Sequence, residues 1–188
     1  VQVDGKETRT GTSYYNDEEV SAIECFLKAF KEKRTEFSLV KTIGIITGYR
    51  PQEKRLRDSL KRIKFGDKCC EIVTIDRFQG REYDLVIVSL VRTDGFGFTD
   101  NIRRMNVALS RAKRHLLIVG NINALYKLSL RNIKSSYNDE NSLESNEQEI
   151  SFVRKDLIPE LHRICDDYAS ADARTKAILT FMKENKYE

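Results

Sequence analysis

Apolar residues form four short, nearly continuous runs along the chain, at 42–47, 71–75, 84–91 and 116–119. The run at 84–91 shows no regular alternation of apolar and polar positions, and the run at 42–47 is mostly β-branched. Runs of this length and composition are typical of strands buried on both faces, as in a parallel sheet. The pattern therefore predicts four buried strands.

Stripes of apolar residues at helical spacing lie between these runs. They predict helices over about 16–33, 51–64, 102–114 and 124–130. Asn16 is a good N-cap for the first helix, and Glu19 three residues later completes a capping-box-like pair. Alternating strands and helices predict an α/β fold, a doubly wound and mostly parallel sheet with helices on both faces. Such folds place a nucleotide-sized crevice at the carboxyl ends of the strands.

The alternation ends near residue 131, which divides the chain into three predicted parts. Residues 1–131 form the α/β domain. Residues 132–149 are rich in Asn, Ser, Asp and Glu, as expected for a flexible linker. Apolar residues return at helical spacing within 150–188, which predicts a C-terminal helical extension.

Composition limits the possible functions. The net charge of +4 permits nucleic-acid binding without demanding it, so the distribution of charge matters more than its sum. The 4 cysteines show no CxxC spacing and only 2 histidines accompany them, so no metal site is predicted. Free thiols indicate an intracellular protein, cytoplasmic or nuclear. No apolar run reaches membrane-spanning length, so no membrane partner is expected.

The first stretch with chemical potential is the polar segment 74–82, which lies between two predicted strands and is expected at the carboxyl edge of the sheet. Gly80 allows a tight turn or a close approach to a ligand. Thr74 offers a hydroxyl to a phosphate, and Glu82 can accept hydrogen bonds from ribose hydroxyls. A polar loop without a ligand has the same composition, and both interpretations remain open on this stretch alone.

The second stretch is the basic helix predicted over 102–114. Arg104 and Arg111 lie two turns apart on one face of that helix, where both could address one anion. A guanidinium directed at a triphosphate stabilises the charge of phosphoryl transfer and is worth about 10³ to 10⁵ in rate. The alternative is a surface ion pair worth less than about 1 kcal/mol.

Three segments in one order resemble helicase motifs. Residues 43–52 (IGIITGYRPQ) resemble motif IV of the superfamily 1 helicases, 74–82 (TIDRFQGRE) motif V, and 103–112 (RRMNVALSRA) motif VI. The stretch SYYNDEE at 13–19 resembles the segment before motif IV in the 1B branch, the group that contains the nonsense-mediated-decay RNA helicase.

The resemblance implies the second RecA-like motor domain of such a helicase, with ATP as cofactor and Mg²⁺ held by the first motor domain. Arg111 takes the position of the arginine finger that reaches the γ-phosphate of ATP on the other motor domain. Gly80 and Glu82 match residues of the nucleotide cleft, Glu82 as the ribose contact. Arg104 joins this ATP-binding set as a residue that braces the cleft.

Four residues are implied to grip single-stranded RNA or DNA. Thr74 matches the motif V hydroxyl that touches the nucleic-acid backbone. Thr47 and Tyr49 lie where motif IV faces the strand, and Gln52 follows them. The first RecA-like domain of the same protein is the expected protein partner, and 5′ to 3′ is the expected direction.

Two departures from the family pattern bear on function. Gly48 replaces a common proline of motif IV, which is expected to loosen that loop. No GxxxxGK[ST] phosphate loop occurs in the sequence, so this chain is expected to need the first motor domain for ATP hydrolysis. A competing hypothesis is a non-catalytic RecA-like scaffold or binding module.

Overall fold

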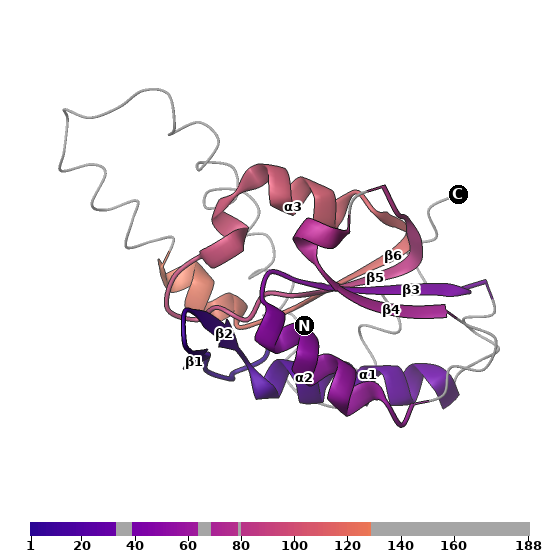
Figure 1. Cartoon of the computed structure of the whole chain (residues 1–188), viewed down its shortest axis with the longest axis horizontal. Helices are drawn as coiled ribbons and strands as arrows, with labels where there is room; N and C mark the ends of the chain where they lie inside the picture. The colour runs from indigo at the N-terminus through magenta and orange to yellow at the C-terminus, as the bar shows by residue number, and fades with distance from the viewer. Residues whose placement is uncertain (33–38, 64–68, 79, 129–188) are drawn as a thin grey trace.

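Four parallel strands form the central sheet. They are β3 (Thr42–Thr47), β4 (Cys69–Thr74), β5 (Tyr83–Ser89) and β6 (Ala112–Val119), in the spatial order β4-β3-β5-β6 (Figure 1). The computed structural model describes residues 1–32, 39–63, 69–78 and 80–128. All four predicted strands are confirmed, and most of their apolar residues are buried.

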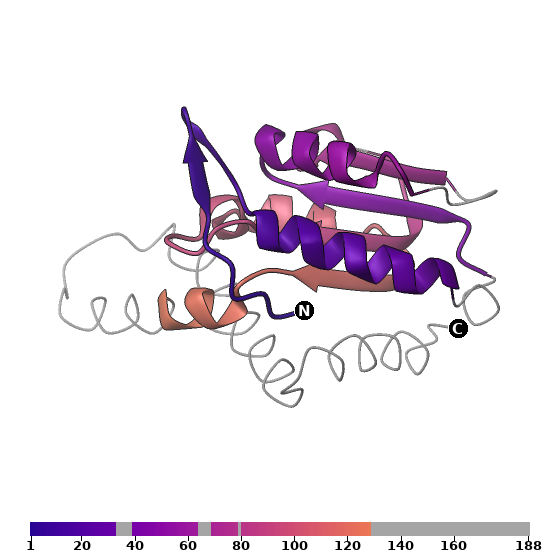
Figure 2. The same ribbon diagram turned by 90° about the horizontal axis from the view of Figure 1, so that it is seen from below.

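Helices cover both faces of the sheet (Figure 1), and Figure 2 shows the face that carries α1 and α2. On one face, α1 (Asp17–Glu32) and α2 (Arg50–Leu60) pack on a core that includes Ile43, Ile45 and Leu85. The other face carries η1 (Ile75–Arg77), η2 (Gly97–Asp100), α3 (Ile102–Leu109) and the helical residues 122–128. The predicted α/β fold, a RecA-like parallel sheet between two layers of helices, is confirmed.

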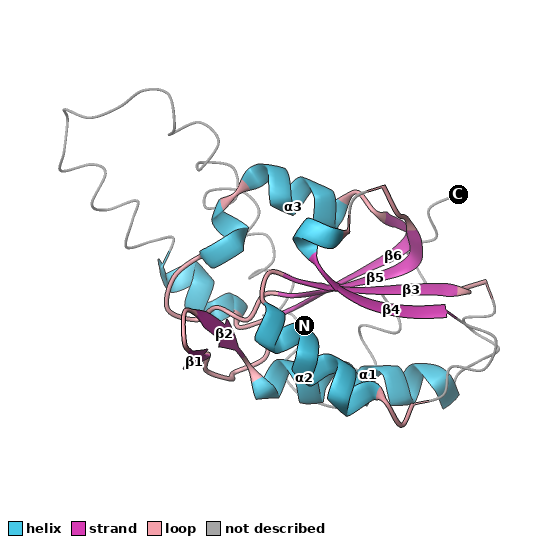
Figure 3. Ribbon diagram, in the orientation of Figure 1, coloured by secondary structure: helices cyan, strands magenta, loops and turns pink. Residues whose placement is uncertain are grey.

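A small hairpin precedes α1. Strands β1 (Thr8–Thr10) and β2 (Ser13–Tyr15) pair antiparallel, and Gly11 takes a φ of 58° in their turn. The sequence pattern does not predict this hairpin because its short strands carry mostly polar side chains. Figure 3 places it beside the ends of the central strands.

The helix predicted over 102–114 is wrong at its C-terminal end. Helix α3 ends at Leu109, and β6 already begins at Ala112, opposite Tyr83 of β5. The Tyr83 amide donates to the Arg111 carbonyl at 3.0 Å. Pairing with a central strand thus prevails over local helix propensity, and Arg111 lies in the turn between helix and strand.

The predicted linker at 132–149 and extension at 150–188 lie outside the described residues. Within the described part of the chain, no helix combines the length and apolar character that crossing a membrane requires.

Candidate functional site at two edges of the sheet

The predicted site residues lie at opposite edges of the sheet. Thr47 and Thr74 end β3 and β4 and face each other in register, at what we call the carboxyl edge. Glu82 and Arg111 directly precede β5 and β6, at the amino edge. The two edges are about 20 Å apart at a rise of about 3.3 Å per residue along β5.

The expectation that all of 74–82 lies at the carboxyl edge is therefore wrong. Strands β4 and β5 both run parallel to β3, so the chain must return across the sheet between them. It does so through η1, whose Ile75 is buried, followed by the buried Phe78. This crossover separates Thr74 from Gly80 and Glu82.

The amino edge brings Glu82, Arg111 and Gly80 to the starts of β5 and β6. Glu82 lies 3.7 Å from the Lys113 ammonium group across the strand pair, and both side chains are about half exposed. Gly80 is exposed and has a φ of +78°, which favours glycine. Arg111 is half-buried, and its Nε has no hydrogen-bond partner among the described residues. Lys113 could not be singled out from the sequence because its partner belongs to another strand.

A second polar cluster stiffens the amino edge. The Glu71 carboxylate accepts hydrogen bonds from the Tyr83 hydroxyl and the Arg81 guanidinium. Burial and the hydrogen bond to Glu71 raise the pKa of Tyr83 to about 12. Asp84 accepts hydrogen bonds from the amides of Lys41 and Thr42, both at 2.9 Å. The hydrogen bonds of Tyr83 and Asp84 fix the first residues of β5 beside Glu82.

Arg104 does not share a helix face with Arg111, because α3 ends between them. Its amide donates to the Asn101 side chain at 3.1 Å, which caps α3. Its guanidinium lies 3.3 Å from Asp76 of η1, and both side chains are well exposed. An exposed ion pair of this kind is worth at most about 1 kcal/mol. Arg104 thus links α3 to η1.

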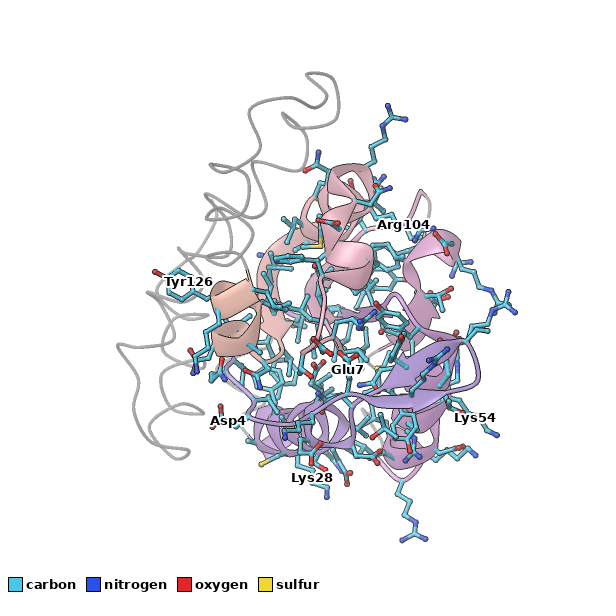
Figure 4. All side chains as sticks on the ribbon, turned by 90° about the vertical axis from the view of Figure 1, so that its left-hand side faces the viewer. Asp4, Glu7, Lys28, Lys54, Arg104 and Tyr126 are labelled. Carbon is cyan, nitrogen blue, oxygen red and sulfur yellow. The ribbon has the colours of Figure 1, made fainter. Side chains whose placement is uncertain are left out.

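Figure 4 views the molecule from the carboxyl edge, with Glu7 near its centre, Arg104 to its upper right and Lys54 to its lower right. The Glu7 carboxylate accepts hydrogen bonds from Arg92 Nε at 3.0 Å and from the Asp94 amide at 2.9 Å. The Arg92 guanidinium lies 4.1 Å from the centre of the Tyr14 ring. Glu7 thereby ties the base of the hairpin to the loop that follows β5.

Thr47 and Tyr49 lie at the carboxyl edge, where Tyr49 packs against other aromatic side chains. Thr47 is fully buried, and its hydroxyl has no partner in the described structure. The Tyr49 ring packs edge-on against Tyr14 and Phe98, at centroid distances of 6.0 and 5.9 Å. A Cβ on Gly48 would lie 2.3 Å from the Phe98 ring. The expectation that Gly48 loosens this loop is therefore wrong, since glycine here permits close packing.

We expect Gly48→Ala to lower the free energy of unfolding by about 1–3 kcal/mol, the usual cost of overpacking. The Gly48 backbone lies outside the left-handed region, so the clash with Phe98 is the expected cause. Urea unfolding of the two single variants and of Gly48→Ala/Phe98→Ala would measure this effect. The cost of Gly48→Ala should shrink in the Phe98→Ala background, and an unchanged cost would contradict the explanation.

Gln52 is fully buried, so its side chain offers no surface to a nucleic acid in this structure. Its Oε1 accepts from the Asn16 amide at 2.9 Å, and its Nε2 donates to the Asn16 carbonyl at 3.1 Å and to Ser89 Oγ at 3.0 Å. Both polar atoms of the Gln52 side chain, Oε1 and Nε2, are thus hydrogen-bonded. Gln52 therefore joins the starts of α1 and α2 to the end of β5.

Glu19 extends this buried network to Val91. Its carboxylate accepts from Ser89 Oγ at 2.6 Å and from the Val91 amide at 2.8 Å. Burial raises the pKa of Glu19 to about 8. Val91 has a φ of 69°, which is strained for a β-branched residue.

The predicted capping pair is confirmed in one half. Asn16 Oδ1 accepts from the Glu19 amide at 3.1 Å. The Glu19 side chain, however, turns to Ser89 and Val91, and Gln52 takes the Asn16 amide instead. The observed partners of Asn16 and Glu19 lie in α2 and at the end of β5, far away in the sequence, so the local spacing could not predict them.

A surface cavity of about 470 Å³ lies between the hairpin, α1 and α2. Arg55 crosses it, with its guanidinium 3.6 Å from the Tyr15 ring centre and 2.6 Å from Asp17. The residues predicted to bind ATP or nucleic acid do not line this cavity.

Comparison with known proteins adds independent evidence. The AAA domain family matches residues 1–123. Among curated relatives, the probable helicase senataxin of Mus musculus is 38% identical over 127 residues, and an ATP-dependent helicase of Methanocaldococcus jannaschii is 38% identical over 127 residues. The regulator of nonsense transcripts 1 of Dictyostelium discoideum is 39% identical over 132 residues.

These three matches cover 65%, 66% and 65% of this chain, and 5%, 18% and 10% of the respective relatives. The chain thus spans less than a fifth of the length of each. The family match covers more than half of the chain. This chain belongs to the AAA domain family and is a helicase domain of superfamily 1, similar to that of the regulator of nonsense transcripts.

Proposed function

We propose that this chain is the second RecA-like motor domain of an ATP-dependent helicase or translocase. In this proposal it completes an ATP site with Arg111 and holds part of a single strand of RNA or DNA. The observation that carries the proposal is the separation of the two residue sets. Gly80, Glu82 and Arg111 share the amino edge, whereas Thr47 and Thr74 end neighbouring strands at the carboxyl edge.

The amino edge fits one side of a bound nucleotide. The Glu82 carboxylate is exposed and can accept hydrogen bonds from ribose hydroxyls. Arg111 has an unpartnered Nε in the described structure, and its guanidinium can donate to a γ-phosphate and stabilise the charge of phosphoryl transfer. Bound ATP supplies the phosphoryl group that is transferred to water.

The remaining parts of the ATP site are proposed to lie on the first motor domain. The sequence has no GxxxxGK[ST] phosphate loop. Among the described residues, no group of three or more His, Cys, Asp and Glu side chains gathers to hold a metal ion. The chain's own residues therefore fit the ribose and the γ-phosphate, and Mg²⁺ is assigned to the partner domain.

The carboxyl edge is proposed to contact the nucleic-acid backbone. Hydroxyl groups at the ends of two paired strands suit phosphate oxygens, which carry no base identity. Both threonines are buried, but Thr74 is 7% exposed and Thr47 is fully buried, so Thr74 is the more accessible. Gln52 is proposed to position the start of α2 rather than to touch the strand. Its buried hydrogen bonds support this role.

Matched substitutions at the two edges of the complete protein test the proposal. Glu82→Ala should raise the KM for ATP by about 10-fold, since a hydrogen bond to a charged group is worth about 1.5–3 kcal/mol. Thr74→Val should instead raise the concentration of single strand that half-saturates ATPase stimulation. Steady-state ATPase assays with ATP and oligonucleotide varied separately give both quantities.

Arg81→Ala is the control at the amino edge, because Arg81 is exposed and pairs with Glu71. It should leave both quantities within about twofold, as expected for a surface ion pair. If Glu82→Ala and Thr74→Val changed both quantities alike, the division of function between the edges would be disproved.

A further inference from the structure

Two arginines follow the ends of the paired strands β3 and β4. Arg50 lies three residues after Thr47, and Arg77 lies three residues after Thr74. The two threonines are in register on strands about 4.8 Å apart, so both arginines leave the carboxyl edge from neighbouring points. Both are exposed.

The charges of Arg50 and Arg77 are not balanced by a carboxylate ion pair among the described residues. The acidic residues next to them in the sequence are already engaged. Glu53 pairs with Arg57 at 2.9 Å, and Asp76 pairs with Arg104 at 3.3 Å. Considering the described residues alone, the carboxyl edge between α2 and η1 therefore presents two guanidinium groups that can bind an external anion.

A third observation at this edge also points to a ligand. The Thr47 hydroxyl, fully buried at the end of β3, has no hydrogen-bond partner in the described part of the molecule. An unsatisfied buried hydroxyl costs about 1–3 kcal/mol and is rare in folded proteins. Such a group is expected where a ligand, or a rearrangement that a ligand causes, completes the hydrogen bonding.

We propose that Arg50 and Arg77 bind successive phosphates of the single strand held at the carboxyl edge. This inference rests on the proposed function and extends it to two residues that the motif comparison does not include. Guanidinium groups bind phosphate oxygens through two parallel hydrogen bonds. Two of them, one on each face of the sheet where the paired strands β3 and β4 end, match a repeating phosphodiester backbone. A mononucleotide is assigned to the opposite edge.

The test is salt-dependent binding of a single-stranded oligonucleotide to the complete protein, measured by fluorescence anisotropy. For single strands, the slope of log K against log salt falls in magnitude by about 0.7 for each phosphate that the protein no longer neutralises. Arg50→Ala and Arg77→Ala should each reduce the slope by about 0.7, and the double variant by about 1.4. Arg50→Lys and Arg77→Lys keep the charge and should keep most of the slope.

Arg62→Ala is the matched control. Arg62 is exposed and follows the end of α2, so the same unit of charge is removed near the amino edge. The slope of log K against log salt for Arg62→Ala should equal that of the parent protein. Unchanged slopes for Arg50→Ala and Arg77→Ala would overturn this inference, as would an equal reduction in Arg62→Ala. A parent protein that binds no single strand would instead overturn the proposed function itself.

Discussion

Arg111→Ala is expected to reduce the ATP turnover of the complete protein by about 10³- to 10⁵-fold, the range that arginine fingers contribute. The affinity for single-stranded nucleic acid should remain close to that of the parent protein. Arg111 lies at the amino edge, about 20 Å along β5 from the proposed nucleic-acid contacts. Single-turnover ATPase assays and oligonucleotide binding would measure the two effects separately.

The fold should survive this substitution. The Tyr83 amide bonds to the main-chain carbonyl of residue 111, which alanine retains. The Nε of Arg111 has no partner within the described structure, so its removal breaks no hydrogen bond there. Far-ultraviolet circular dichroism and the thermal unfolding temperature should therefore change little.

Two further variants sharpen the result. Arg111→Lys keeps a positive charge but loses the planar fork that contacts phosphate oxygens, so it should recover a small part of the turnover. Arg114→Ala removes a charge three residues further along β6, where Arg114 pairs with Asp84 at 3.5 Å. It should keep turnover within about twofold. Normal turnover in Arg111→Ala would remove the arginine-finger assignment.

The sheet was predictable because strands buried on both faces are continuous apolar runs, which are easily recognised in a sequence. The runs that became β3 and β5 contain mainly β-branched residues and Leu, and few other structures bury such short segments so completely. The apolar stripe of α1 was equally clear, and Asn16 marked its start. These patterns involve residues that are close in the sequence, so they can be recognised without knowing which elements pack together.

The predicted site residues are divided between two edges because of the direction in which each strand runs, which the sequence spacing of these residues does not reveal. Thr74 and Glu82 are close in sequence but separated by a crossover that only the strand order reveals. The end of α3 is a second example, because Arg111 continues the basic helical pattern. Pairing between Tyr83 and Ala112, far apart in sequence, decides that boundary.

Glu19→Ala is expected to lower the free energy of unfolding by about 2–5 kcal/mol. It leaves the Val91 amide and the Ser89 hydroxyl without their acceptor, and each buried unpaired group costs about 1–3 kcal/mol. Partial relief of the strain at Val91 reduces the net cost. Urea unfolding would measure the change. A decrease below about 0.5 kcal/mol would show that the network does not stabilise the domain.

Glu19→Gln separates the shape of this side chain from its charge. The folded pKa of Glu19, about 8, lies above the ordinary value of 4.5, so the folded state favours the neutral acid. The stability that Glu19 contributes is complete below pH 4.5 and is lost as the pH rises from 4.5 to 8. Glutamine resembles the neutral acid and does not titrate in this range.

The difference in unfolding free energy between the parent chain and Glu19→Gln should therefore depend on pH. Near pH 5 the parent should be the more stable, because its neutral acid keeps Oε1 as the acceptor of the Val91 amide and shares one proton between Oε2 and Ser89 Oγ. Near pH 9 the parent must bury a carboxylate, and its advantage should vanish or reverse. His115, whose pKa is lowered by burial, is common to both proteins and cancels in the difference. A difference that stays constant from pH 5 to pH 9 would mean that Glu19 is ionised throughout, held by its two hydrogen-bond donors.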